Sequence, residues 1–141
     1  MNVIIYTDGG CVPNPGRGGW AAFVQYPDRG VELSGAENDS TNNRMELTAA
    51  INALESLTGS PQVQLFTDSE YVKKGITEWL PNWRARGWKR KGGTLANQDL
   101  WMRLDKLTQK FQIEWKWVRG HSGNVLNEKV DRLVRQAINN Q

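Results

Sequence analysis

The chain has 141 residues, a net charge of +3 at pH 7, one cysteine and one histidine. This length fits one domain with a single core, and no apolar run approaches the ~18 residues that a membrane helix needs. One cysteine excludes an intramolecular disulfide, and one cysteine with one histidine cannot build an ordinary structural zinc site. The first residues lack the basic and apolar regions of a secretory signal, so we expect a cytoplasmic protein with a reduced thiol.

The N-terminal part predicts an antiparallel meander. Residues 3–7 are apolar and β-branched, and this strand delivers Asp8 at its C-terminal end. The glycine-rich residues 9–19 are expected to form a long turn, followed by strands at 20–26 and 31–35. The glycines match neither a P-loop nor a dinucleotide motif. We therefore expect them to let the backbone approach a nucleic acid closely.

The remainder alternates between helical and strand patterns. Helices are predicted at 42–57, after Ser69, at 79–88 with breaks at Pro81 and Gly87, at 98–110 and at 125–138; strands are predicted at 63–67 and 113–118. The inward stripes of three helices are expected to be Leu47, Ala50, Ile51, Leu54 and Leu57; Leu100, Leu104 and Leu107; and Leu126, Val130, Leu133 and Ala137. This order of elements implies an α/β domain with a mixed sheet flanked by helices.

Four acids are predicted at the ends of elements that this topology can bring together. Asp8 and Asp68 follow strands, where ligands of such sheets bind, and Glu46 and Asp131 are expected in the first turns of two helices. Crowded carboxylates raise one another's pKa, and hard cations such as Mg²⁺ or Mn²⁺ resolve that conflict better than zinc. The alternative is that Glu46 and Asp131 only complement the dipoles of their helices.

Positive charge is concentrated in one segment. Between Arg84 and Lys91, five of eight residues are basic, and Trp83 and Trp88 are interleaved with them. Without these five residues the rest of the chain would carry more acids than bases. The pattern favours a polyanionic partner, with a solvated basic loop as the alternative.

Five sequence motifs, taken together, closely resemble the type 1 ribonucleases H of bacteria. They are Tyr6-Thr-Asp-Gly-Gly-Cys, Asn14-Pro-Gly, Thr41-Asn-Asn-Arg-Met-Glu-Leu, Thr67-Asp-Ser and His121-Ser-Gly with Asn127-Glu and Asp131-Arg-Leu. The resemblance runs from end to end. It implies a ribonuclease H-like fold in a single domain, residues 1–141, with a five-stranded mixed sheet of order 3-2-1-4-5 flanked by helices. It also implies a basic handle at about residues 79–95.

The resemblance also implies an activity. The chain would be an endonuclease that hydrolyses the RNA strand of RNA–DNA hybrids by a two-metal-ion mechanism, leaving 5′-phosphate and 3′-hydroxyl ends. Asp8, Glu46, Asp68 and Asp131 match the acids that hold two Mg²⁺ or Mn²⁺ ions. His121 matches a catalytic histidine on a loop, where it assists proton transfer or product release. The protein is expected to act as a monomer, without a membrane.

Substrate contacts carry over in the same way. Asn14, Thr41 and Asn42 match residues that hold the DNA-strand backbone, and Cys11, Asn14 and Asn43 match residues that reach the minor groove. The handle contributes a channel of aromatic residues and a set of phosphate contacts, namely Trp79, Trp83 and Trp88, with Lys89, Arg90 and Lys91. Asn42 and Asn43 could instead cap a helix, and Trp79 could instead belong to the core.

Five positions depart from the family pattern. Gly10, Pro13 and Arg17 alter the glycine-rich segment, Val134 replaces a small alanine, and Glu70 faces the substrate groove where several relatives have glutamine. None of them removes a catalytic group. The rival interpretations are another nuclease of this fold, such as a junction resolvase or integrase core, and a hybrid-binding module without catalysis.

Overall fold

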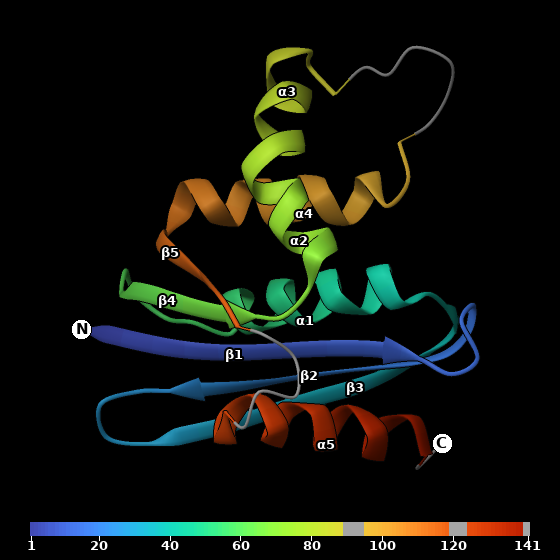
Figure 1. The fold of residues 1–141 in the computed structure, drawn as a ribbon. Coiled ribbons are helices and arrows are strands. Elements are labelled where there is room, and N and C mark those ends of the chain that lie inside the picture. Colours follow the sequence, from blue (N-terminus) through green and yellow to red (C-terminus); the bar gives the residue numbers. More distant parts are fainter. Residues whose placement is uncertain (89–94, 119–123, 140–141) are drawn as a thin grey trace.

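The computed structural model describes residues 1–88, 95–118 and 124–139. Its centre is a five-stranded sheet of order β3-β2-β1-β4-β5 (Figure 1). The strands are β1 (Asn2–Cys11), β2 (Gly16–Gln25), β3 (Gly30–Ser40), β4 (Gln62–Thr67) and β5 (Gln112–Trp117). The first three strands pair antiparallel, whereas β4 and β5 run parallel to β1. The predicted strand order and the mixed sheet are confirmed.

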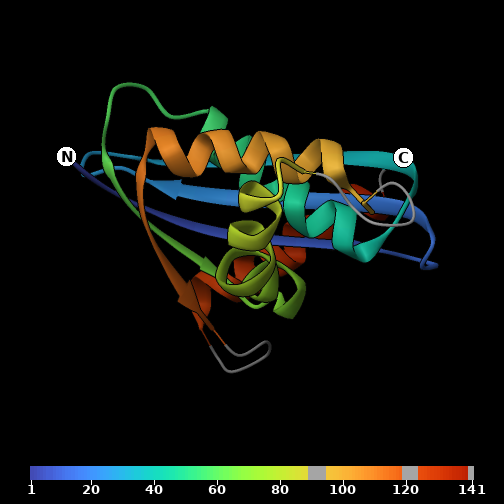
Figure 2. The same cartoon turned by 90° about the horizontal axis from the view of Figure 1, so that it is seen from above.

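Helices cover both faces of this sheet. α1 (Asn42–Glu55) packs on β1 and β2, with α4 (Gln98–Lys110) against it, and α5 (Val125–Asn139) covers the opposite face of β1 to β3 (Figures 1 and 2). A third helical unit leads away from the sheet and consists of α2 (Glu70–Lys74), η1 (Gly75–Trp79) and α3 (Leu80–Ala85). No helix among the described residues is long and apolar enough to cross a membrane.

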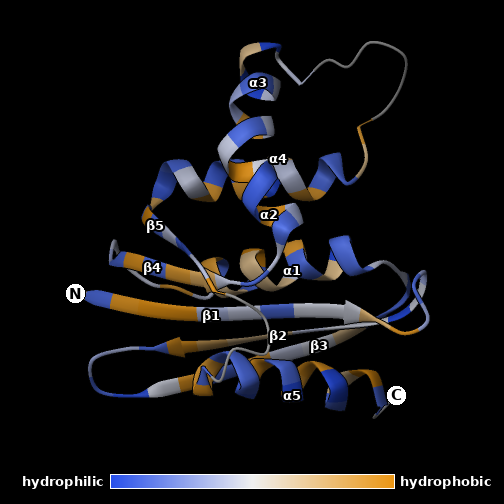
Figure 3. Ribbon diagram, in the orientation of Figure 1, coloured by the Kyte–Doolittle hydropathy of each residue, from blue (hydrophilic) through white to orange (hydrophobic). Residues whose placement is uncertain are grey.

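The main core lies between the sheet and α1. All five residues of the stripe predicted for α1 are buried, as are the three predicted for α4. In α5 the prediction was partly wrong, because Val130 and Val134 are buried whereas Leu126, Leu133 and Ala137 are only half-buried. Val130 and Val134 form the centre of the contact with Tyr6 and Ala21 of the sheet. Figure 3 shows the apolar start of β1 and the alternation of apolar and polar residues along α5.

The glycine-rich segment is not the long turn that we predicted. Gly9, Gly10 and Cys11 extend β1 and pair with Trp20, Gly19 and Gly18 of β2. A Cβ atom on Gly19 would come within 2.9 Å of the Val134 carbonyl oxygen. Glycine therefore lets a helix lie directly on the strand here, whereas the predicted close approach to a nucleic acid stays a prediction.

The helices after Ser69 also differ from the prediction. Instead of two separate helices, residues 70–85 form one continuous helical unit with a π-helical turn, η1, in its middle. Pro81 cannot donate a hydrogen bond to the preceding turn, but it follows the π-helical turn directly and the helical unit continues through it, so the predicted break at Pro81 is wrong. Gly87, at φ +61°, follows the end of α3, as expected for the residue beyond a helix end.

Candidate active site

Asp8 and Asp68 come from adjacent parallel strands. The register pairs Tyr6 of β1 with Phe66 of β4, and each aspartate lies two residues beyond its member of that pair. The two rings stack with centroids 4.5 Å apart, just before the acids. Asp8 is 8% exposed and lies inside β1 rather than at its end, because β1 continues along β2. The end of the parallel pairing, and not the end of the strand, therefore places this acid.

Glu46 reaches the same place from α1. The backbone N–H of Gly9 donates to Glu46 Oε1 at 3.3 Å. A Cβ atom on Gly9 would lie 2.4 Å from the backbone carbon of Met45, so only glycine allows α1 to approach β1 this closely. Glu46 is the fifth residue of α1, past the first turn in which we had predicted it, and that first turn contains no acid.

The three side chains form a compact cluster of oxygen ligands. One carboxylate oxygen from each of Asp8, Glu46 and Asp68 lies within 4.8 Å of the others. Oε2 of Glu46 is buried without a hydrogen-bond partner in the described part of the chain. A buried carboxylate oxygen in this condition is costly unless a cation or a donor completes it.

The electrostatics of the cluster point the same way. Burial raises the pKa of Asp8 to about 8, helped by the negative charges of Asp68 and Asp131. Burial, followed by the charges of Asp8 and Asp68, also raises the pKa of Glu46 well above its ordinary range. The fold therefore confines negative charge that has no counter-charge among these groups, and a divalent cation held by oxygen ligands would relieve the conflict.

Asp131 approaches from α5, on the other face of the sheet. Its charge and its hydrogen bond to Asp8 both contribute to the raised pKa of Asp8, so the two carboxyls are neighbours. Its Oδ2 lies 3.4 Å from Nη2 of Arg135, one turn further along α5. Asp131 is not in the first turn of α5, as predicted, but in the second. The acids at 8, 46, 68 and 131 are thus brought together, with Asp131 outside the tightest group of three.

Four residues predicted to contact the nucleic acid lie at or near the N-terminus of α1. Thr41 caps this helix by accepting a hydrogen bond from the Arg44 N–H at 3.1 Å. Asn14, from the connection between β1 and β2, accepts one from the Asn42 N–H at 3.1 Å. Asn14, Thr41, Asn42 and Asn43 are all exposed. The cap is therefore Thr41, and the side chains of Asn42 and Asn43 are accessible to a ligand.

Cys11 and Glu70 occupy contrasting positions. Cys11 is buried and its Sγ donates to the Ser40 carbonyl at 3.2 Å. Its contact with the minor groove stays a prediction, and the burial of the thiol does not favour that contact. Glu70 is exposed and is the first residue of α2, directly after the cap Ser69 and two positions after Asp68.

The handle tryptophans pack against the protein to a greater degree than the sequence indicated. Trp79, Trp83 and Trp88 are half-buried and contact the main core. Trp83 lies with its ring centroid 5.5 Å from that of Trp101, a fully buried residue of α4. Arg84, which the sequence placed in the basic patch, is instead paired with Asp105 of α4. The base of the handle is therefore a packed unit.

Four predicted residues lie outside the described part of the chain. They are His121 and the handle residues Lys89, Arg90 and Lys91.

One residue with a structural role was missed. Asn124 accepts hydrogen bonds from the N–H groups of Leu126 and Asn127, at 3.1 and 3.0 Å, and so caps α5. Its Nδ2 also donates to the Tyr6 hydroxyl at 3.3 Å. An asparagine directly before a helical pattern is a cap signal that would have identified the first contact, whereas the second depends on the tertiary fold.

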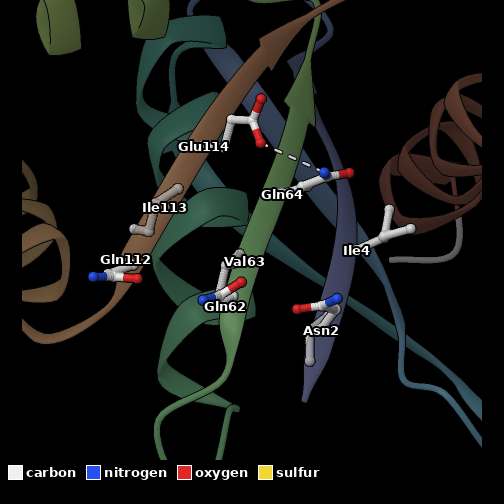
Figure 4. Close-up of a pocket in the computed structure, with 9 residues that line it drawn as sticks. Asn2, Ile4, Gln62, Val63, Gln64, Gln112, Ile113 and Glu114 are labelled. Atoms are coloured by element: carbon white, nitrogen blue, oxygen red, sulfur yellow. Dashed lines mark hydrogen bonds between the residues drawn. The ribbon is translucent and has the colours of Figure 1, made fainter.

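A shallow pocket lies far from these acids. It has a volume of about 440 Å³ and lies where β1, β4 and β5 begin, whereas the carboxylates follow the ends of β1–β4 pairing. Figure 4 shows its lining of amide side chains, with Gln64 donating to Glu114. The pocket contains one acid and no cluster, so it does not share the chemistry of the acidic site.

Known proteins match this chain along nearly its whole length. A family model described as RNase H matches residues 1–139. Ribonuclease H of Xanthomonas campestris is 56% identical over 139 residues, which cover 97% of this chain and 93% of that relative. Ribonuclease HI of Pseudomonas aeruginosa is 54% identical over 137 residues, which cover 96% and 93%.

Solved structures agree. LC9-RNase H1, described as a type 1 RNase H with the type 2 active-site motif, has a TM-score of 0.88 and 32% identity, over 99% of this chain and 73% of that chain. LC11-RNase H1, solved in complex with an RNA/DNA hybrid, has a TM-score of 0.75 over 98% and 97% of the two chains; at 22% identity it shows the fold alone. The chain therefore belongs to the ribonuclease H family, among its bacterial type 1 members.

Proposed function

We propose that this protein hydrolyses the RNA strand of RNA–DNA hybrids with Mg²⁺ as its cofactor, leaving 5′-phosphate and 3′-hydroxyl ends. The observation that carries the proposal is the convergence of carboxylate oxygens from Asp8, Glu46 and Asp68 within 4.8 Å of one another. Membership of the ribonuclease H family supports the reaction class, and an all-oxygen ligand set supports Mg²⁺ or Mn²⁺ over zinc.

The residues present fit a pair of divalent ions. Asp8, Glu46 and Asp68 would hold them, and Asp131 would complete the set from α5. Two ions so held would supply positive charge to the attacking and leaving oxygens of an in-line phosphoryl displacement. Asp8, with a pKa of about 8, must release its proton before it can serve as a ligand. The Gly9 N–H holds Oε1 of Glu46, and Oε2, which is buried without a hydrogen-bond partner in the described part of the chain, would be available to a metal ion.

The DNA strand is proposed to run past the N-terminus of α1. Asn14, Thr41, Asn42 and Asn43 are exposed there and offer neutral hydrogen-bonding groups. Such groups position a phosphate backbone without reading bases, so we propose cleavage without strong base specificity. Minor-groove contacts, where 2′-hydroxyls are accessible, would distinguish RNA from DNA. His121, which lies outside the described residues, is proposed to assist proton transfer or product release.

The handle is proposed to hold the DNA strand on one side of the cleavage site. Lys89, Arg90 and Lys91 would contact phosphates, and the half-buried Trp83 and Trp88 would contribute aromatic surface to the DNA strand. The packing of these rings against one another, with centroids 5.9 Å apart, supports a rigid base for such contacts. We further propose that the chain acts as a monomer in the cytoplasm, with Cys11 as a buried reduced thiol.

The proposal is tested with end-labelled substrates of one sequence, prepared as RNA–DNA hybrid, duplex RNA and duplex DNA. With Mg²⁺, we expect the hybrid RNA strand to be shortened and both other duplexes to stay intact. The products should carry 5′-phosphates, detected by ligation to a 3′-hydroxyl acceptor. Cleavage that survives EDTA would contradict the metal chemistry, and equal cutting of duplex DNA would contradict the substrate. A binding module without catalysis would retain the hybrid uncut.

A further inference from the structure

Arg44 links three elements next to the proposed active site. It lies in α1, two residues before Glu46 and three after the cap residue Thr41. Its Nε donates to Glu37 Oε1 of β3 at 3.1 Å. Its Nη1 and Nη2 donate to the two carboxylate oxygens of Asp99 in α4, at 3.4 and 3.1 Å. Such a two-pronged contact fixes direction as well as distance, because the guanidinium plane and the carboxylate plane must align.

Asp99 connects this contact to the base of the handle. It lies in the first turn of α4, the helix that begins directly after the handle segment. Two residues earlier, Asn97 donates to the Tyr71 hydroxyl at 3.2 Å, and two residues later Trp101 Nε1 donates to the same hydroxyl at 3.0 Å. Tyr71 belongs to α2, in the helical unit that carries the handle outward. The start of α4 is thus bound to the start of the handle.

The arrangement of the helices makes Arg44 the link between two substrate contacts. α1 and α4 run side by side in the same direction, with their N-termini at the same end (Figures 1 and 2). The N-terminus of α1 carries Thr41 and Asn42, which are proposed to hold the DNA strand. α4 begins just after the handle segment, and the handle is proposed to hold the same strand further along.

We propose that Arg44 is a positioning residue that fixes the handle relative to the N-terminus of α1, so that both grip one DNA strand in register. This inference rests on the proposed function for the nature of the ligand. Arg44 itself does not touch substrate in this role. Its contribution to binding passes through Asp99 and therefore requires a handle that binds.

The chain offers a matched control for this role. Arg103, near the middle of α4, pairs with Glu55 at the C-terminal end of α1 at 2.6 Å, so it joins the same two helices away from the N-terminus of α1. Arg44 and Arg103 each form an ion pair that is partly exposed. Removing either one perturbs the α1–α4 interface, but only the loss of Arg44 should release the start of α4 from the proposed DNA contacts.

The test measures affinity for an uncut RNA–DNA hybrid in EDTA, by fluorescence anisotropy, together with kcat in Mg²⁺. Arg44→Ala and Asp99→Asn should each weaken hybrid binding about five-fold, because a partly exposed ion pair contributes modestly to any equilibrium. At saturating hybrid, kcat of each variant should stay within about two-fold of the wild-type value. Arg44→Lys should restore only part of the affinity, since an ammonium group cannot reproduce the two-pronged contact.

A variant without the basic handle residues distinguishes a positioning role of Arg44 from general destabilisation. In a chain with Lys89, Arg90 and Lys91 all changed to Ala, Arg44→Ala should produce no further loss of affinity. An equal loss in both backgrounds, or an equal loss for Arg103→Ala, would overturn the inference. Failure of the proposed function is recognised separately, as a wild-type protein that binds the hybrid but does not cut it.

Discussion

The backbone N–H of Gly9 donates to Oε1 of Glu46 at 3.3 Å, so β1 orients a carboxylate that α1 carries. The contact is short in space but spans 37 residues of sequence. It explains why a glycine must follow Asp8: the strand, the helix and the two acids can meet only if residue 9 has no side chain.

Gly9→Ala is predicted to destabilise the protein and to weaken divalent-metal binding. The new Cβ atom would lie 2.4 to 2.5 Å from the backbone of Met45 and Glu46, so α1 must move. We expect a loss of about 3 kcal/mol in the free energy of unfolding, at the upper end of the cost of overpacking. Urea denaturation and Mg²⁺ titration measure the two effects.

Gly10→Ala is the control for that experiment. Its Cβ atom would meet only the Val134 side chain, at 3.5 Å, which is ordinary van der Waals contact. If both substitutions were equally tolerated, the close approach of α1 to β1 would not be the reason for glycine at position 9.

Asp8→Asn is predicted to stabilise the metal-free protein in a pH-dependent way. The folded pKa of Asp8 is about 8, against about 4 in an unfolded chain. Below pH 4 both states hold the proton, so Asp8 costs nothing there; between pH 4 and 8 the unfolded state alone releases it, and stability falls as pH rises. In EDTA, the melting temperature of the variant should therefore exceed that of the wild type at pH 9 and approach it near pH 4.

Magnesium should reverse this ranking. A cation that binds the folded state raises its stability, and the wild type has the ligand that the variant lacks. The gain for wild type should grow between pH 6 and 8, as Asp8 becomes easier to deprotonate. A variant that gains as much from Mg²⁺ as the wild type would exclude Asp8 as a ligand.

Replacing Lys89, Arg90 and Lys91 by Ala is predicted to raise KM and to flatten its dependence on salt. Each lost phosphate contact should reduce the slope of log KM against log salt by about 1. Cleavage assays between 50 and 200 mM salt, roughly the range in which such slopes are resolved, provide the measurement. Lys106→Ala with Lys110→Ala, toward the other end of α4, should leave the slope unchanged. If the slope fell by the same amount per removed charge in both variants, the effect would be a general one of net charge.

Asn124→Ala is predicted to destabilise the protein by about 1 kcal/mol through loss of the α5 cap. Tyr6→Phe should cost less, because it removes only the hydroxyl that Asn124 contacts and keeps the stack on Phe66. Urea denaturation is the readout. Asn139→Ala, at the exposed end of the same helix, is the reference. A cost for Asn124→Ala no greater than the cost for Asn139→Ala would show that the cap contributes nothing.

The architecture and the acids were accessible from the sequence for identifiable reasons. The helical period of Leu47, Ile51 and Leu54 identifies the buried face of α1, and all three are buried. Alternating strand and helix patterns predict a mixed sheet, and the motifs that resemble ribonucleases H fix the strand order. Asp8 and Asp68 follow apolar strands that pair in parallel, so their proximity follows from the topology.

Other features depend on contacts between distant segments. Gly9 and Gly19 have low strand propensity, yet they lie in β1 and β2 because the sheet hydrogen bonds and the packed helices outweigh that preference. The Arg84–Asp105 pair withdraws one charge from a patch that composition alone makes uniformly basic. Pattern along the chain reveals neither effect, since both require knowledge of which elements meet.

Cleavage of an end-labelled RNA–DNA hybrid by Asp8→Asn tests the central claim most directly. The reference is Asp28→Asn, which removes an exposed acid that pairs with the adjacent Arg29. At one Mg²⁺ concentration and with both variants confirmed as folded, Asp28→Asn should cut the RNA strand at the wild-type rate and Asp8→Asn should leave it intact. Cleavage by Asp8→Asn at a rate close to that of wild type would contradict a mechanism built on this carboxylate cluster.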